Sequence, residues 1–227
     1  MCRLVTMQWK LLYRMAALFC SVGVTMMSCA EQHKQNHSMK DEIVTHVNAD
    51  IDTATFGTGC FWCTEAIFQQ LKGVEKVVSG YSGGTIENPS YEDVCTGRTG
   101  YAEVCQVYFD PKQIPFDELL KVFWKVHDPT TLDRQGNDIG PQYRSVIFYN
   151  SDEQKKESEF YKEQLDKSGA FSAPIVTAIE PLHNFYAAED YHQNYYNNNS
   201  GQAYCRFVVQ PKLKKFEEAF KTKLKGF

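Results

Sequence analysis

The sequence has no excess of positive charge. Its 227 residues include 24 Lys and Arg against 28 Asp and Glu, which gives a formal net charge of -4, and no basic stretch carries interleaved aromatic residues. Proteins that bind nucleic acids need clustered cations to neutralise phosphates, so we expect no nucleic-acid partner. There is no internal repeat either, and the length suits one domain with an appendage.

Long hydrophobic runs are also missing. The apolar stretch MAALFCSVGVTMMSC at 15–29 is too short to cross a bilayer comfortably. Lys10 and Arg14 precede it with positive charge, an order typical of a secretory signal segment. The sequence therefore predicts a targeting segment at its N-terminus.

The targeting segment ends in MMSC, and Cys29 stands where a bacterial lipobox has its acylated cysteine. An ordinary signal peptide or a frayed helix would also fit, but the abrupt change to the polar AEQHKQNHSMKDE favours lipidation. We expect a signal segment at 1–28, a lipid-anchored polar tether at 29–52 and a globular domain at 53–227. The protein would then be anchored in the bacterial cell envelope and face the periplasm.

The eight cysteines do not leave an even set in the domain. Cys2 and Cys20 are removed with the signal segment, and Cys29 carries the lipid. An odd number cannot pair completely, so a pure disulfide framework is excluded and at least one thiol is free, reactive or transiently paired. The five that remain are Cys60, Cys63, Cys95, Cys105 and Cys205.

Helices and strands alternate along the domain, which indicates one mixed α/β layer structure. Ser151 and Gln154 predict a capping box at one helix start, and the turn-rich stretch 87–100 is expected to be a loop. The predicted strands are 53–59, 74–84, 101–110, 142–150 and 174–182, and the predicted helices are 60–71, 116–128, 152–168 and 213–224.

Cys60 follows a glycine turn and opens the helix of GCFWCTEAIF. Unpaired N–H groups and partial positive charge at a helix start favour a thiolate, so we expect its pKa to lie below roughly 8.5. The alternative is a buried structural cysteine. A zinc site on Cys60 and Cys63 is a weaker hypothesis, because no second ligand pair has the required spacing. The only candidates for it are Cys205, His183 and His192.

Glu103 lies on a predicted strand with Cys105, Val107 and Phe109 on the same face. An ionised glutamate facing a core is costly. Glu103 therefore either points to solvent or stays neutral in a cleft, where it can act as a general acid. His192, within AEDYHQNYY, is either a base for a cysteine or a helix cap.

Seven motifs carry a resemblance that covers about 53–210. They are GCFWCTEAIF, GYSGG, NPSYEDVCTGRTGYAEV, FWKVHDPTT, RQGNDIGPQYRSVIFY, FYAAEDYHQNYY and YCRFVVQPK. In this order they closely resemble the A-type methionine sulfoxide reductases, the peptide-methionine (S)-S-oxide reductases. The resemblance implies an α+β fold, with a two-layer α/β plait (ferredoxin-like) core and extra coil, and makes 53–227 a single catalytic domain.

The resemblance assigns the central chemistry to one helix start and one strand. Cys60 matches the nucleophile, and Phe61 and Trp62 match the residues that receive the methyl group of the substrate. Glu103 matches the acid that protonates the sulfoxide oxygen. Attack by Cys60 on the sulfur would release methionine and leave a sulfenic acid, which a second thiol converts to a disulfide.

Further matching residues lie in three other motifs. Tyr91 and Tyr143 match the hydrogen-bonding partners of the sulfoxide oxygen. Asp138 falls in the substrate-facing GND loop, and Tyr204 with Cys205 matches the tail that carries a resolving cysteine. The stretch NNNSGQAY before Cys205 is expected to be flexible enough to bring that thiol to the nucleophile.

Two positions depart from the family pattern. Many relatives have glycine at Cys63 and histidine at Tyr101. The first departure leaves the resolving thiol open between Cys63 and Cys205. Cys63 is favoured because it is one helical turn from Cys60, and Cys205 would be a fallback or a relay to the reductant.

The predicted function is reduction of the S-epimer of methionine sulfoxide, free or in proteins, by a monomer. The resemblance implies no metal or organic cofactor, and a thioredoxin-like dithiol as reductant. A thioredoxin-like electron carrier that uses Cys60 and Cys63 is the main alternative. A zinc-binding envelope module is the second.

Overall fold

The computed structural model describes residues 51–226. The predicted signal segment, the lipidated Cys29 and the tether as far as residue 50 lie outside the described residues. Among the helices of residues 51–226, none combines the length and the apolar character that a membrane crossing requires.

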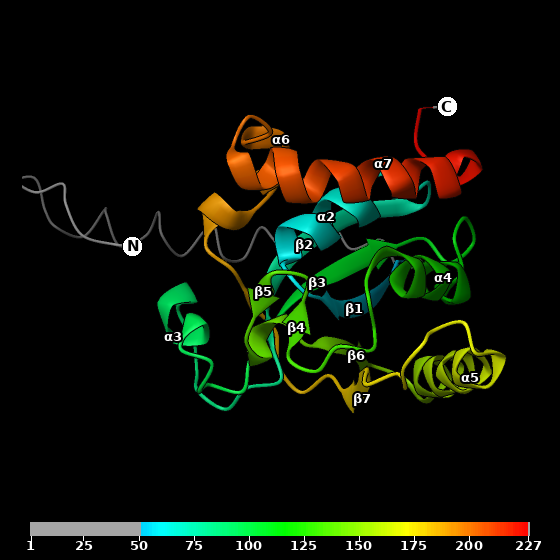
Figure 1. Cartoon of the computed structure of the whole chain (residues 1–227), viewed down its shortest axis with the longest axis horizontal. Coiled ribbons are helices and arrows are strands. Elements are labelled where there is room, and N and C mark those ends of the chain that lie inside the picture. The colour runs from blue at the N-terminus through cyan, green and yellow to red at the C-terminus, as the bar shows by residue number, and fades with distance from the viewer. Residues whose placement is uncertain (1–50, 227) are drawn as a thin grey trace, which may run out of the picture. The chain divides into compact units, whose positions relative to one another are not determined.

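A six-stranded sheet forms the centre of the domain (Figure 1). Its order is β7-β6-β1-β3-β2-β8, and all neighbours are antiparallel except β6 and β7. The elements β1–α2–β2–β3–α4–β6 give the βαββαβ plait with inner order β6-β1-β3-β2, so the predicted fold class is confirmed. The strands are β1 (Asp52–Thr58), β2 (Val74–Ser82), β3 (Ala102–Phe109), β6 (Ser145–Tyr149), β7 (Ala178–Pro181) and β8 (Tyr186–Ala187).

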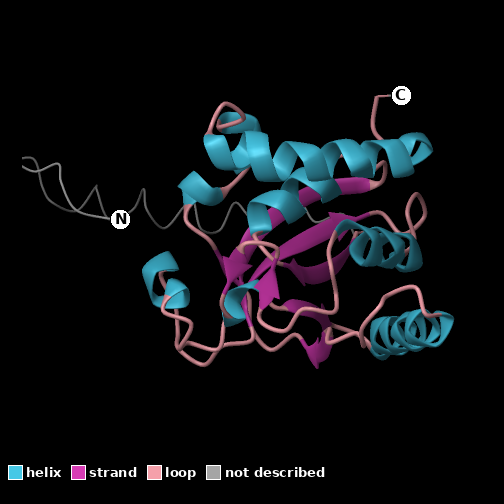
Figure 2. Cartoon of the chain, viewed as in Figure 1, coloured by secondary structure: helices cyan, strands magenta, loops and turns pink. Residues whose placement is uncertain are grey.

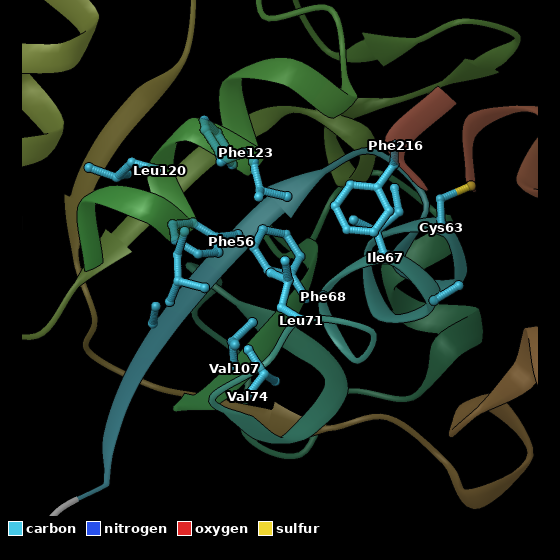
Figure 3. Packing of buried hydrophobic residues seen from close by; sticks show 14 of the residues in the cluster. Phe56, Cys63, Ile67, Phe68, Leu71, Val74, Val107, Leu120, Phe123 and Phe216 are labelled. Atoms are coloured by element: carbon cyan, nitrogen blue, oxygen red, sulfur yellow. The ribbon is translucent and has the colours of Figure 1, made fainter. Parts of the chain in front are cut away.

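Helices α2 (Phe61–Phe68), α4 (Phe116–Val126) and α7 (Gln210–Ala219) surround one large core. Figure 2 shows them above and to the right of the strands, with α7 running along α2. Alternation along β1 turns Phe56 towards these helices. Its ring centroid lies 5.3 Å from those of both Phe68 and Phe123, and Figure 3 shows the cluster.

The opposite face of the sheet is covered by coil. Val104, Val146 and Phe148 form a small buried cluster there. Leu182 and Phe185, from the connection between β7 and β8, pack against it. This connection is part of the extra coil that the resemblance implies, and it leaves the helix-covered face as the larger core.

Helix α5 (Asp152–Ser168) has only half of the predicted capping box. The Ser151 hydroxyl accepts the N–H of Gln154 at 3.2 Å, as expected. The Gln154 side chain, however, accepts the N–H of Asn150 at 3.3 Å and donates to the carbonyl of Thr53 at 2.8 Å. The side chain therefore fastens the start of α5 to β1 instead of closing the reciprocal bond.

Two segments predicted as loops contain helical turns. Residues 87–100 include α3 (Tyr91–Cys95), which Ser90 caps reciprocally with Asp93. The stretch before Cys205 includes α6 (Tyr195–Asn198), and a π-helical turn, η3 (Cys205–Val209), leads directly into α7. Residues 199–202 between these helical segments are non-helical, and the flexibility of this stretch stays a prediction.

Candidate active site

A glycine turn delivers the first thiol of the site. Gly59 has a φ of +93°, and a Cβ at this position would lie 2.5 Å from the Cβ of Gln135. Cys60 follows as the N-cap of α2, so the predicted helix start is confirmed. The chain therefore reverses sharply between β1 and α2, and Cys60 is left only 7% exposed.

The prediction of a lowered pKa for the Cys60 thiol is wrong. Burial raises its pKa well above the usual value, because the buried thiolate loses its hydration. The neighbouring Cys63 thiol raises it further. The backbone N–H of Trp62 and the Tyr204 hydroxyl lower the pKa of Cys60. The helix start therefore favours the thiolate as expected, but burial has the larger effect.

Cys63 forms a pair with Cys60. The hydrogen bond from the Cys60 thiol lowers the pKa of Cys63, burial raises it, and the nearby cation of Lys212 lowers it again. Of the two thiols, Cys60 is therefore the harder to ionise. Both thiols are buried in the structure and free of disulfides.

Glu103 is a buried acid beside this pair. Glu103 is 1% exposed, and its Oε2 accepts the backbone N–H of Phe61 at 3.1 Å. Burial raises its pKa well above the usual value, and the charges of Cys60 and Asp138 raise it further. The solvent-facing alternative is therefore excluded, and the carboxyl group remains protonated where an ordinary glutamate would be ionised.

The two tyrosines predicted to bind the sulfoxide oxygen lie at the edge of a buried cluster that contains Cys60. Tyr91 begins α3, and Tyr143 ends the short 3₁₀ helix η1 (Pro141–Tyr143). Both are partly buried and pack against the cluster that contains Cys60. Burial is the main cause that raises the pKa of each, so both hydroxyls stay neutral and can donate hydrogen bonds.

Phe61 and Trp62 form an aromatic wall next to Cys60. Phe61 is fully buried, whereas Trp62 is half-buried. The Trp62 ring stacks on Tyr195 with centroids 3.7 Å apart and an interplanar angle of 7°. Its Nε1 donates to Nδ1 of His192 at 3.1 Å. His192 is therefore neither a base for a cysteine nor a helix cap, because its ring bonds to the aromatic wall.

Tyr204 links the thiols to the substrate-facing loop. Its hydroxyl donates to Oδ2 of Asp138 at 2.7 Å, and its proximity lowers the pKa of the Cys60 thiol. Asp138 begins β5 (Asp138–Ile139), which forms a two-residue hairpin with β4 (Arg134–Gln135). Tyr204 thus joins the hairpin that carries Asp138 to the neighbourhood of Cys60.

Cys205 is the second candidate for the resolving thiol. It is fully buried at the start of η3, in the main core cluster that also contains Cys63. Burial raises the pKa of its thiol.

Sequence reasoning missed the residues that support the aromatic wall. Glu65 on α2 accepts the N–H groups of Asn194 at 2.8 Å and Tyr195 at 3.3 Å. Glu189 accepts the Tyr81 hydroxyl and the Tyr91 N–H, each at 2.9 Å. Partners about a hundred residues apart leave no periodic signal in one sequence, so no local pattern identifies them.

The zinc hypothesis finds no ligand set in the part of the chain that the structure describes. Within residues 51–226, no group of three or more His, Cys, Asp and Glu side chains is placed to hold a metal ion.

The comparisons decide the family. The sequence model described as peptide methionine sulfoxide reductase matches residues 52–224. The chain belongs to the peptide methionine sulfoxide reductase family. Two relatives named peptide methionine sulfoxide reductase MsrA are similar in sequence, and members of this family are oxidoreductases. One, from Leptospira borgpetersenii, is 53% identical over 78% of this chain and 99% of its own. The other, from Deinococcus radiodurans, is 52% identical over 80% and 88%.

Solved structures of this family share the fold. Mxr1 from Saccharomyces cerevisiae in reduced form is 38% identical, with a TM-score of 0.66 over 71% of this chain and 92% of its own. Methionine sulfoxide reductase A of Corynebacterium diphtheriae is also 38% identical, with a TM-score of 0.61 over 67% and 77%. The resemblance of the seven motifs to this family is confirmed.

Proposed function

We propose that this protein reduces methionine sulfoxide in proteins and peptides to methionine, with Cys60 as nucleophile and Glu103 as acid. One observation carries the proposal. The backbone N–H of Phe61, the residue after Cys60, donates to the side chain of Glu103. This bond holds a buried, protonated carboxyl group next to the peptide unit that follows the thiol. Membership of the peptide methionine sulfoxide reductase family supports the choice of substrate.

The first step transfers oxygen from substrate to enzyme. The Cys60 sulfur attacks the sulfoxide sulfur while the proton of Glu103 moves to the sulfoxide oxygen, and the thiol proton of Cys60 restores the Glu103 carboxyl group. The sulfur–oxygen bond of the substrate breaks as the hydroxyl group is transferred to the Cys60 sulfur, so methionine leaves and Cys60 becomes a sulfenic acid. The substrate is reduced by two electrons and the cysteine is oxidised by two. Tyr91 and Tyr143 donate hydrogen bonds to the oxygen as charge develops on it.

Three contacts select one epimer. The methyl group lies against Phe61 and Trp62, the oxygen faces Glu103 and the tyrosines, and the sulfur faces Cys60. With these three directions fixed, the rest of the methionine side chain has one way out of the site, so only one configuration at sulfur fits. The family resemblance assigns this configuration to the S-epimer.

Cys63 resolves the sulfenic acid. Its thiolate attacks the Cys60 sulfur, a disulfide forms, and the oxygen leaves as water. The lowered pKa of Cys63 and its place one helical turn from Cys60 support this choice over Cys205. An external thioredoxin-like dithiol then reduces the disulfide, either directly or after exchange with Cys205.

The N-terminal sequence supports a place in the cell envelope. Cleavage before Cys29 and its acylation would anchor the domain through the tether 29–52 on the periplasmic side. The envelope is an oxidising compartment, where exposed methionines of other proteins become sulfoxides and a repair enzyme is useful.

The test is turnover of a methionine sulfoxide peptide, supplied separately as each diastereomer, with dithiothreitol as reductant. We expect reduction of the S-epimer by the wild type and no turnover by Cys60→Ser. Reduction of both epimers at equal rates, or near-normal turnover by Cys60→Ser, contradicts the proposal. A protein that ignores both epimers but reduces insulin disulfides is the dithiol electron carrier that the paired thiols would also suit.

A further inference from the structure

The hydrogen bond between Trp62 and His192 fixes the protonation state of the histidine. An indole Nε1–H can only donate, so Nδ1 of His192 must be an unprotonated acceptor at 3.1 Å. The neutral ring therefore carries its proton on Nε2. A second proton would have to enter at Nδ1, where it would face the indole N–H, and two donors cannot bond to each other.

Nε2 of His192 has no hydrogen-bond partner in the described part of the chain. The residue is 1% exposed, and the Glu189 carboxylate lies 3.9 Å away, beyond hydrogen-bonding distance. Both oxygens of Glu189 already accept other groups, the Tyr81 hydroxyl and the Tyr91 N–H. A buried donor without a partner costs free energy, so the position of this ring is set by its other contacts.

The backbone on both sides of His192 is anchored. The side chain of Gln193 bonds to the N–H and the carbonyl of Ser79 at 3.1 and 2.9 Å. The carbonyl of Glu189 accepts the His192 N–H at 2.8 Å. On the far side, Glu65 accepts the N–H of Asn194. The backbone that carries His192 is therefore held in place, and packing against the surrounding rings sets the position of the imidazole.

We infer that His192 is a positioning residue for Trp62, and that it holds the aromatic wall only as the neutral ring protonated on Nε2. A second proton on the ring breaks the bond to the indole and releases Trp62. This inference rests on the proposed function, in which Trp62 receives the methyl group of the substrate.

The groups around His192 set the pH at which this happens. Burial lowers its pKa from the usual value of 6.5, while the carboxylates of Glu189 and of Glu92 on α3 oppose the shift. The rings of Tyr91 and Tyr191 lie 4.5 and 4.2 Å away, centroid to centroid. The neighbouring face of α2 presents two further rings, those of Phe61 and Trp62. The wall is therefore intact at neutral pH and released in acid.

Two substitutions distinguish loss of the Trp62–His192 hydrogen bond from loss of its pH dependence. In His192→Asn, the side-chain oxygen can take the place of Nδ1 as acceptor, and it does not titrate. His192→Phe keeps a ring but loses the acceptor. We expect His192→Phe to raise KM about fivefold to tenfold with little change in kcat, the effect of one lost hydrogen bond. We expect His192→Asn to keep KM near wild type and to remove its rise in acid.

The decisive measurement follows the indole directly and needs no turnover. With 15N-labelled tryptophan and Trp62→Phe for assignment, the Trp62 Nε1–H resonance should titrate in the wild type with a midpoint below 6.5. It should be pH-independent in His192→Asn, and the Trp124 indole serves as internal reference. A Trp62 resonance that does not titrate in the wild type, or is unchanged in His192→Phe, overturns the inference. Because this readout is independent of turnover, it also holds if the sulfoxide assay fails.

Discussion

The backbone N–H of Phe61 donates to Oε2 of Glu103 at 3.1 Å, and this bond joins the start of α2 to the middle of the sheet. Phe61 is the neighbour of Cys60, so the distance between nucleophile and acid is set by one peptide unit and one strand. The same bond tends to lower the pKa of Glu103, but burial outweighs it. The acid is thus held in place without losing its proton.

Replacing Glu103 with Gln should slow the chemical step about 10²- to 10⁴-fold, the usual contribution of a positioned proton donor. The amide oxygen can still accept the Phe61 N–H, so the geometry is kept. Single-turnover formation of methionine under quench measures this step. Tyr91→Phe and Tyr143→Phe are matched controls that should each cost less, since either hydroxyl can bond to the oxygen alone. An unchanged rate in Glu103→Gln would refute the assignment.

The same substitution should stabilise the fold. The pKa of Glu103 is higher in the folded than in the unfolded state, so its contribution to stability is present at low pH and is lost as the pH rises above the unfolded value. Glu103→Gln removes this loss, and its free energy of unfolding should exceed that of the wild type increasingly from pH 5 to pH 8. Urea unfolding across this range measures the difference, and two parallel curves would show that the wild-type carboxyl group is not buried and neutral.

The first disulfide formed after one turnover should join Cys60 to Cys63. One equivalent of sulfoxide, rapid alkylation and peptide mapping identify it. The same disulfide should form at the same rate in Cys205→Ser, because Cys63 lies one helical turn from Cys60 and can attack without a third thiol. If Cys60 pairs first with Cys205, and Cys63→Ser resolves normally, Cys63 is a structural thiol.

Acid should destabilise the domain through His127. The ring is buried between the carbonyl of Phe123 and the hydroxyl of Ser145, each at 2.7 Å, and burial lowers its pKa to about 4. Protonation is thus easier in the unfolded chain, with its value near 6.5, so stability is full above that pH and falls as the pH drops towards 4. The loss should reach about 3 kcal/mol, from about 1.4 kcal/mol per pKa unit.

Urea unfolding at pH 7 and pH 4.5 tests the role of His127. His127→Gln should be less stable at pH 7, because it leaves the Phe123 carbonyl without its donor, but its stability should change less between the two pH values. His192→Asn is the matched control for the other buried histidine. Equal pH dependence in the wild type and His127→Gln would assign the acid loss to other groups.

Cys29→Ser should release the protein from membranes, because acylation requires the thiol. Fractionation of cells that express the full chain, with mass measurement of the product, follows both the anchor and the cleavage. If the variant still sediments with membranes and retains residues 1–28, the apolar segment is an uncleaved anchor.

The sequence predicts elements well where a period or a cap is local. The alternation in β3 correctly places Glu103, Cys105 and Phe109 on the helix-covered face, since a strand repeats every two residues. The five-residue helix α3 is missed because it is too short to show a period, although its Ser90 and Asp93 cap was readable. The π-helical turn at Cys205 has no sequence signal at all.

Electrostatics is where local reasoning fails. The position of Cys60 at a helix start is correctly predicted, but its pKa is not, because burial comes from segments far away in the chain. The Tyr204 hydroxyl, for example, approaches from 144 positions downstream. A single sequence identifies which groups can ionise, whereas the cost of ionising them depends on how the whole domain closes around them.

The buried pair of thiols also decides how the protein withstands the oxidants whose damage it repairs. Hydrogen peroxide attacks thiolates, and the protonated, enclosed Cys60 offers it little to react with before a substrate arrives. Cys63 is equally enclosed at 3% exposure. Burial of both thiols should therefore slow their oxidation by peroxide from bulk water, and with it the path to the irreversible sulfinic acid.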